Sequence, residues 1–255
     1  MGRNETCKAI VLRTYRIGEI HVGVTLFTEV NGLVQAIAHG ANSRNGKLRG
    51  LTNPFCYGTV YLYNDPVKKS TKVSDFDVQD FFIGLRESVR RYYTASLWSE
   101  VVLKSFGGGE SAPPLFALFV SALKLLDTAS EPVAGRLSAQ FLARYLSMVG
   151  HLPDTAECGN CGRSLAGSVG ESRAFYSATQ ELFLCERCAG PDMLSIPVKS
   201  MVYLDSTLGC DTISAALAAE PDAGVVEPLL NLLYALVAAL VETPLSTLEI
   251  GRGIL

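Results

Sequence analysis

The sequence predicts an α+β protein of several domains. We expect an N-terminal five-stranded β-barrel, followed by an α-helical domain that carries an inserted four-cysteine zinc module. Three observations support this: alternating segments in residues 8–73, apolar residues at helical spacing later on, and two Cys-x-x-Cys pairs between 158 and 188. Of the 255 residues, 48% are hydrophobic and 18% are charged, so the chain has enough apolar material for a sizeable core.

The predicted strands alternate β-branched or aromatic residues with small or polar ones, and turn residues separate them. They cover residues 8–16, 22–29, 33–39, 55–63 and 67–73. Asn31-Gly32 is the dipeptide most typical of a two-residue hairpin turn, and a long polar loop spans residues 40–54. Five short strands in one small domain suit a closed barrel such as an OB-fold, because closure leaves no strand edge unpaired.

After residue 76 the apolar residues follow a helical period. The pattern predicts one helix from Phe82 through Tyr92, which the glycines at 107–109 end. Further helices are expected at 115–128, 134–150, near 197–205, after Asp211 and at 222–241. The apolar run 229–241 is shorter than the roughly 20 residues that cross a bilayer, so it predicts a buried helix.

These changes of pattern divide the chain into four expected parts. They are the barrel domain (1–79), a first helical part (80–154), the cysteine module (155–192) and a second helical part (193–255). Residues 1–80 hold ten Lys/Arg against seven Asp/Glu, whereas the rest holds twelve against eighteen. An anionic partner is therefore expected at the front of the chain, although so small an excess also arises by chance.

The cysteine pairs have the spacing of metal-binding knuckles. Cys158 and Cys161, like Cys185 and Cys188, are two residues apart, which lets both thiolates of a pair reach one tetrahedral ion. The pattern predicts one zinc ion; disulfides, a redox pair or a four-sulfur iron site are the alternatives. The first residues lack a secretory signal, so we expect a cytoplasmic protein with reduced thiols. Four sulfurs leave no open coordination position, which indicates a structural zinc.

Basic residues of the predicted barrel suggest a nucleic-acid surface. The candidates are Arg13, Arg16, Arg44, Lys47, Arg49, Lys68, Lys69 and Lys72, the last three on the predicted fifth strand. Small barrels bind single strands with loops and strand faces, where cations follow phosphates and aromatic rings stack on bases. Tyr15 and Tyr61 are among the available rings, but most barrel aromatics are expected in the core. The alternative for the basic loop is an ordinary solvated turn.

A second basic cluster, Arg86, Arg90 and Arg91, follows the predicted barrel. Arg86 and Arg90 are expected one turn apart on a helix face, and Glu87 can pair with Arg91. The cluster is a candidate partner-binding site, and a solvated helix surface is the alternative. No Walker A, Gly-x-Gly-x-x-Gly, Gly-x-Ser-x-Gly or His-Glu-x-x-His signature occurs, so we predict that the protein is not an enzyme.

In this order and spacing, the segments resemble the RecO family of bacterial DNA repair and recombination mediators. The likeness spans nearly the whole chain. Its landmarks are Gly18-Glu19, Gly40-Ala41, the basic loop 43–50, Pro54-Phe55, and "LSMVGHLPDTAECGNCGR" with "FLCERCAG" around the cysteines. The resemblance implies an OB-fold DNA-binding domain, a helical domain and a zinc module. Where many relatives carry a basic residue after the hairpin glycine, this chain has Leu33.

The resemblance also implies a function that no single motif indicates. Members bind single- and double-stranded DNA, anneal complementary strands and help load the RecA recombinase onto DNA coated by single-strand-binding protein. Expected partners are RecR and the C-terminal tail of single-strand-binding protein, in the cytoplasm at the nucleoid and without a membrane. The acidic helical half weakens the case that it contacts DNA. A zinc-stabilised adaptor that binds only proteins is the alternative function.

Overall fold

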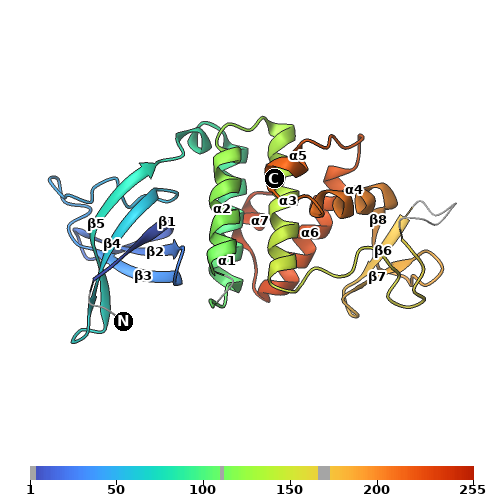
Figure 1. Ribbon diagram of the computed structural model, residues 1–255, viewed down its shortest axis with the longest axis horizontal. Coiled ribbons are helices and arrows are strands. Elements are labelled where there is room, and N and C mark those ends of the chain that lie inside the picture. Colours follow the sequence, from blue (N-terminus) through green and yellow to red (C-terminus); the bar gives the residue numbers. More distant parts are fainter. Residues whose placement is uncertain (1–3, 110–111, 166–172) are drawn as a thin grey trace. The chain divides into compact units, whose positions relative to one another are not determined.

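The protein folds into two compact units in a computed structural model, which describes residues 4–109, 112–165 and 173–255 (Figure 1). The first unit holds the described residues up to Ser88 together with those of Ser99–Asp127. The second unit holds Val89–Trp98 and the described residues from Thr128 onward. Each unit has its own core. The four expected parts are a finer division by fold type, and their boundaries stay a prediction.

Five strands of the first unit close into a barrel in the order β1-β2-β3-β5-β4. They are β1 (Asn4–Ile17), β2 (His21–Thr28), β3 (Gly32–Ala38), β4 (Tyr57–Asp65) and β5 (Ser70–Asp80). Strand β4 pairs antiparallel with β1, and β3 meets β5 in parallel at Ile37 and Lys72, which completes the closure. This is the order of a five-stranded OB-type barrel, so the predicted fold class is confirmed.

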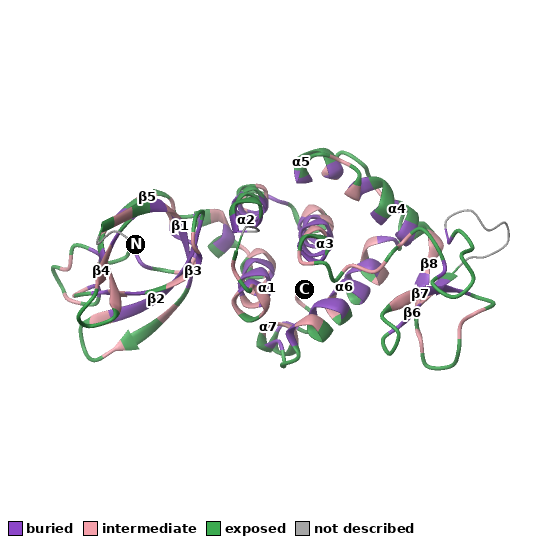
Figure 2. Cartoon of the chain, turned by 60° about the horizontal axis from the view of Figure 1, so that its bottom comes forward, coloured by how far each residue is buried: buried purple, intermediate pink, exposed green. Residues whose placement is uncertain are grey.

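Buried apolar residues of all five strands form the core of the barrel, and Figure 2 colours the buried residues of the chain purple. Val11, Val24, Val60 and Leu62 are almost completely buried there, as the alternating pattern predicts. Leu48, from the loop between β3 and β4, joins the same core. The loop is therefore tied to the barrel from inside.

The hairpin between β2 and β3 differs from the predicted two-residue turn. Thr28 pairs with Gly32, so the loop contains three residues, 29–31. Gly32 has a positive φ of 65° and forms the first residue of β3. Three-residue hairpin loops commonly end in a residue of this left-handed conformation, which explains why glycine stands there.

Helix α2 (Ala112–Leu126) packs on the outside of the barrel within the first unit. Phe27 of β2 points away from the barrel core, and its ring lies 5.4–6.0 Å from those of Phe106, Phe116 and Phe119. Edge-to-face contacts at such distances are favourable for aromatic rings. The outer face of β2 is thus a second, helix-covered core.

The single helix predicted from Phe82 is wrong. A short 3₁₀ helix, η1 (Ile83–Glu87), is followed by extended Ser88, and α1 (Val89–Ser105) begins only after it. The Asp80 carboxylate accepts the Phe82 N–H at 2.8 Å, and the Asp127 carboxylate accepts the Leu85 N–H at 2.9 Å. These side-chain acceptors hold the segment in a non-α conformation that periodicity alone does not reveal.

The second unit is a helical bundle around α3 (Glu131–Met148). The first part of α1, up to Trp98, also belongs to this unit. The later helices are α4 (Val198–Leu208), α5 (Ile213–Leu217), α6 (Val226–Val241) and α7 (Ser246–Ile250). Helix α3 packs against α4, α5 and α6, and the Trp98 and Phe141 rings stack with centroids 4.4 Å apart. Helix α6 contains the apolar run 229–241 and buries one face, as predicted. Among the described helices, none has the length and apolar character of a membrane span.

The cysteine module belongs to the second unit. Strands β6 (Arg173–Ser177), β7 (Leu182–Cys185) and β8 (Leu194–Pro197) form a small sheet in the order β7-β6-β8. Strand β8 leads directly into α4 and packs against α4 and α6. The sheet thus connects the cysteines to the helical bundle.

Candidate functional site

The four predicted cysteine ligands converge at one end of the module. The sulfur atoms of Cys158, Cys161, Cys185 and Cys188 all lie within 4.8 Å of one another. The Cys161 and Cys185 sulfurs are 3.8 Å apart, too far for a disulfide bond. In a tetrahedral site with metal–sulfur bonds of about 2.3 Å, neighbouring sulfurs lie about 3.8 Å apart. The four thiols therefore have a spacing that could hold one metal ion.

Backbone hydrogen bonds shape this cluster and favour a thiolate. The Gly162 N–H donates to the Cys158 carbonyl at 2.8 Å, and the Cys188 N–H donates to the Cys185 carbonyl at 3.0 Å, which folds each pair into a tight turn. Burial raises the pKa of the Cys158 thiol. Hydrogen bonds from backbone N–H groups, among them that of Cys185, outweigh burial and lower this pKa to about 6. A cation held by these sulfurs would therefore find a ligand that is readily deprotonated.

The basic loop at residues 40–54 is a series of tight turns anchored on the barrel. Leu48 is buried in the core, whereas its neighbours Lys47 and Arg49 are exposed. A Cβ atom at Gly46 would overlap the Gly40 carbonyl, so only glycine allows the two parts of the loop to approach this closely. The loop therefore holds its cations on a defined backbone conformation.

Two cations of this loop have partners that set their positions. Lys47 forms an ion pair with Asp75 of β5 at 2.7 Å, and this lysine lowers the pKa of the Asp75 carboxyl. Arg49 donates to the Arg44 carbonyl at 3.0 Å. Because the Lys47 side chain is 70% exposed, the ion pair is screened by solvent and can exchange its partner for a phosphate.

A groove of about 540 Å³ lies beside this loop, on the barrel. Its lining residues come from β1, β2 and the loop: Thr14, Tyr15, Arg16, Val22, Ala41, Asn42, Arg49, Gly50, Thr52 and Asn53. Two of the predicted DNA-binding residues, Arg16 and Arg49, thus line the same hollow. Among its described lining residues none is Asp or Glu, so the groove is a positive environment.

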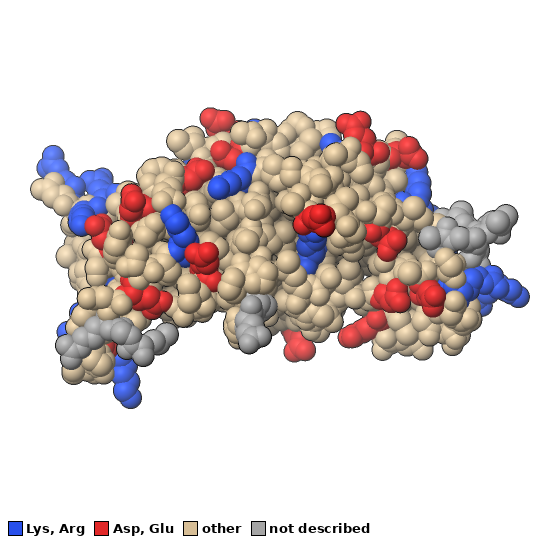
Figure 3. All heavy atoms as spheres, in the orientation of Figure 1, with Lys and Arg blue, Asp and Glu red and all other residues tan. Residues whose placement is uncertain are grey.

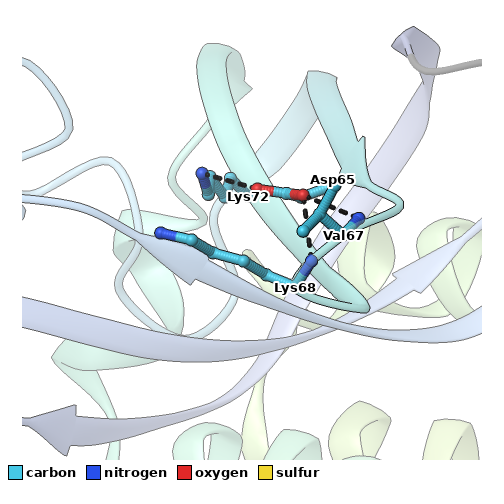
Figure 4. A network of polar contacts seen from close by, with 4 residues as sticks. All are labelled: Asp65, Val67, Lys68 and Lys72. Carbon is cyan, nitrogen blue, oxygen red and sulfur yellow. Dashed lines mark hydrogen bonds and ion pairs between the residues drawn. The ribbon is translucent and has the colours of Figure 1, made fainter.

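The lysines predicted on the fifth strand lie elsewhere on the barrel. Asp65 accepts the N–H groups of Val67 and Lys68, both at 3.1 Å, and fixes a turn before β5 (Figure 4). Lys68 and Lys69 therefore lie in this turn, and the prediction that they are strand residues is wrong. Lys72 does lie on β5, where it forms an ion pair with Asp65 at 3.4 Å.

Two histidines lie near the lysines of this turn. The rings of His21 and His39 meet edge to face with centroids 4.7 Å apart, and Lys72 is paired with Ile37 on the neighbouring strand. Burial, the neighbouring His21 and the cations Lys72 and Lys68 lower the pKa of His39, which favours its neutral form. The lysines therefore provide the fixed positive charge there.

The predicted DNA-binding residues form separate groups rather than one surface. Arg16 and Arg49 share the groove; Lys68, Lys69 and Lys72 belong to the β4–β5 turn and strand; Arg13 is an exposed β1 residue outside the groove lining. In Figure 3, Lys and Arg side chains project from the loops of the barrel, with acidic side chains between them. In the groove the cations lie with the exposed Tyr15, and in the β4–β5 group the Lys72 Nζ lies 5.7 Å from the centroid of the half-buried Tyr63 ring.

The arginines of the candidate partner site do not share a helix. Arg86 lies in η1, where its guanidinium donates to the Pro54 carbonyl at 3.4 Å, whereas Arg90 and Arg91 lie in α1 beyond extended Ser88. Arg90 lines a hollow of about 890 Å³ in the second unit, together with Tyr234 and several acidic residues. The expectation that Arg86 and Arg90 share one helix face is therefore wrong.

Sequence reasoning missed the polar side chains that complete the groove, among them Asn42, Thr52 and Asn53. They come from a loop without periodicity, so no pattern predicts where they point. One signal was present: Tyr15 stands opposite Gly23 in the β1–β2 pair, and a glycine in a strand often marks a close approach by another group.

Comparison with known proteins shows the family. The model of the recombination protein O N-terminal domain matches residues 1–80, and that of the C-terminal domain matches residues 86–249. "DNA repair protein RecO" of Bacillus subtilis is 27% identical over 196 residues, which span 76% of this chain and 72% of the relative. That of Pelotomaculum thermopropionicum is 29% identical over 180 residues, or 71% and 66% of the two chains. The two family models cover nearly the whole chain, which therefore belongs to the recombination protein O (RecO) family.

Proposed function

We propose that this protein binds single- and double-stranded DNA through its barrel and acts, without catalysing a reaction, as a mediator in DNA repair and recombination. The observation that carries the proposal is the groove in which Arg16 and Arg49 lie without a lining carboxylate. Curated relatives named "DNA repair protein RecO" support a role in DNA repair. The location that we propose is the cytoplasm, at the nucleoid.

The proposed binding is mainly electrostatic. Arg16, Arg44, Lys47 and Arg49 neutralise phosphates and release counterions, so affinity falls as salt rises. Each contact adds about 0.7 to the salt slope for single strands and about 0.9 for duplex. Lys68, Lys69 and Lys72 form a second, weaker contact region, because Lys72 is only 30% exposed beside Asp65, whereas Lys47 is 70% exposed. Two strands screened on one protein surface repel each other less, and this is how we propose that annealing is promoted.

We further propose that the four-cysteine cluster holds one structural Zn²⁺. Four sulfur ligands are typical of structural zinc sites, and the sulfur spacing fits the bond length of zinc thiolates. The ion would supply folding free energy to the small module and no open coordination position for substrate.

The proposed partners are RecA-loading components: RecR and the acidic tail of single-strand-binding protein. Arg86, Arg90 and Arg91 are the candidates for the tail. The hollow beside Arg90 is also lined by Glu131, Glu220 and Glu227, which would repel an acidic peptide there. Exposed Arg86 is therefore a stronger candidate than Arg90.

The test compares two sets of three substitutions. Arg44→Ala, Lys47→Ala and Arg49→Ala together should lower the salt slope for a single-stranded oligonucleotide by about 2 and weaken binding at low salt. The control is Arg163→Ala, Arg173→Ala and Arg187→Ala, three exposed arginines of the cysteine module, for which we expect an unchanged slope.

Fluorescence anisotropy at several salt concentrations measures both sets, and an annealing assay with and without single-strand-binding protein tests the mediator role. If the loop variant keeps the wild-type slope, the loop is not the binding site. If the wild-type protein has no oligonucleotide affinity even at low salt, the alternative of an adaptor that binds only proteins is favoured.

A further inference from the structure

We infer that Tyr15 is a stacking platform for one unpaired base of a bound single strand, and that this ring makes the groove prefer single strands to duplex. The inference rests on the proposed DNA binding. It deepens that proposal by naming the side chain that distinguishes single strands from duplex. It is carried by the way the ring lies on the barrel, by its exposure and by its neighbours in the groove.

The ring lies against the sheet rather than projecting from it. Tyr15 and Gly23 are directly opposite each other in the β1–β2 pair. A Cβ atom at Gly23 would overlap the Cζ, Cε1 and Cε2 atoms of the ring, so the ring covers the glycine Cα. A side chain at position 23 would push the ring away. Gly23 thus fixes the ring in a position that no other residue type permits.

One side of this ring remains open to solvent. Tyr15 is 43% exposed although the ring rests on the strand beneath it, so the exposed area is the side that faces away from Gly23. A flat aromatic side chain held in this way loses little conformational freedom on binding. Base stacking on such a ring is tolerant of sequence, because every base has a π-face.

The neighbours of the ring suit a nucleotide. Arg16 follows Tyr15 directly, and its Nε donates to the Gly18 carbonyl at 2.9 Å, which orients the guanidinium. Arg49 lines the same groove from the loop. Exposed amides of Asn42 and Asn53 offer donors and acceptors to a base edge. The volume of about 540 Å³ lies within the range of small-ligand sites, roughly 300–1,000 Å³.

Stacking requires a base that is not already stacked on both sides. In duplex DNA the bases are paired and stacked within the helix, so the ring can contact only the backbone or an end. The arginines, in contrast, neutralise phosphates of either form. The cations therefore set overall affinity and salt dependence, whereas Tyr15 sets the preference for single strands.

The experiment compares Tyr15→Leu with Tyr15→Phe and with a matched control, Tyr61→Leu. Tyr61 is a barrel tyrosine of nearly equal exposure, 42%, on β4 and outside the groove. Affinities are measured for a single-stranded oligonucleotide, for a blunt duplex and for an oligonucleotide of the same length in which all bases are replaced by abasic sites. Thermal unfolding of each variant shows whether the barrel is intact.

We expect Tyr15→Leu to weaken single-strand binding about tenfold or more, with duplex affinity and salt slope unchanged. Tyr15→Phe and Tyr61→Leu should bind like the wild type. On the abasic oligonucleotide, which keeps the phosphates, the wild type and Tyr15→Leu should bind equally.

Wild-type single-strand affinity in a folded Tyr15→Leu variant overturns the inference. An equally large loss of affinity for the duplex or for the abasic strand overturns the inference as well. The proposed function survives these outcomes if the Arg44, Lys47 and Arg49 variant still lowers the salt slope. If Tyr15→Leu does not fold, Gly23→Ala displaces the ring without deleting it, and its unchanged single-strand affinity overturns the inference as well.

Discussion

The barrel of the first unit and the cysteine module of the second bury their interiors in different ways. The barrel core contains fifteen buried apolar side chains among the described residues, drawn from five strands and one loop. The module has strands of only four or five residues, and its four clustered thiols, of which Cys161 is exposed, would have to lose their protons to bind an ion. Apolar burial stabilises the barrel, whereas for the module we propose that a bound metal ion adds to the stability.

This difference suggests that the cysteine module has a structural role and that the barrel carries the binding surface. The cysteines, which stand out most in the sequence, form a four-thiol cluster that would leave a bound metal ion no open position for a further ligand. The barrel core leaves its loops and outer strand faces free to bind, and one such face carries the groove with Arg16 and Arg49. Because apolar burial stabilises the barrel from inside, its outer surface can carry a polar groove.

The largest expected effect is loss of the metal site. Cys158→Ser removes one of four sulfur ligands, and structural zinc in small domains contributes on the order of 10 kcal/mol or more to folding. We expect about one zinc per chain in the wild type, much less in the variant, and rapid proteolysis within residues 155–192. Elemental analysis and limited proteolysis measure these.

Cys210→Ser is the matched control, because Cys210 lies outside the cluster and its Sγ donates to the Ser206 carbonyl, a contact that a serine hydroxyl can replace. The barrel should keep its fold in both variants. A wild-type protein without metal, in which all four thiols titrate freely, contradicts the zinc site.

A smaller effect is expected for the barrel core. Leu62 is 2% exposed, and Leu62→Ala leaves a cavity among the core side chains. We expect the free energy of unfolding of the barrel to fall by about 2–5 kcal/mol, with the zinc content unchanged. Urea unfolding followed by circular dichroism measures the change.

Val67→Ala serves as the control, since Val67 is 89% exposed in the β4–β5 turn and its loss should change stability by no more than about 0.5 kcal/mol. Release of zinc from the Leu62→Ala variant would show that the barrel and the cysteine module are not stabilised independently.

The smallest effect concerns pH. Hydrogen bonds from the N–H groups of Lys68 and Val67, and Lys72 nearby, lower the pKa of Asp65 below its ordinary value of 3.8. A lowered folded-state pKa stabilises the fold above the unfolded pKa, and this contribution is lost as pH falls through the folded pKa. Asp65→Asn keeps an oxygen acceptor for the turn but does not titrate in this range.

We therefore expect Asp65→Asn to flatten the fall in barrel stability between pH 5 and pH 2, as measured by urea midpoints. The effect is small because Lys72 is 30% exposed, so solvent screens its ion pair with Asp65. An identical pH dependence in the variant and the wild type would show that the Asp65 turn does not contribute.

Much of the fold could be predicted, because local patterns carry it. Alternation in residues 8–39 predicts three strands that are present, and the Cys-x-x-Cys spacing predicts four thiols that do converge. The predicted helix from Phe82 failed because a hydrogen-bond acceptor far away in the sequence fixes the backbone conformation there. Asp127 binds the Leu85 N–H from 42 residues away, and the segment before α1 consequently forms a 3₁₀ helix.

From the sequence one could infer a five-stranded barrel, a helical second half and the thiol cluster, because alternation, helical period and ligand spacing are properties of neighbouring residues. The predicted fifth strand begins too early, since β5 runs from Ser70 to Asp80. It took the folded structure to show that Arg16 and Arg49 line one groove and that Tyr15 rests on Gly23. These facts depend on strand register and barrel closure, which join residues that are far apart in the chain. A binding surface is assembled from such pairs, and for this reason it emerges only when the chain is folded.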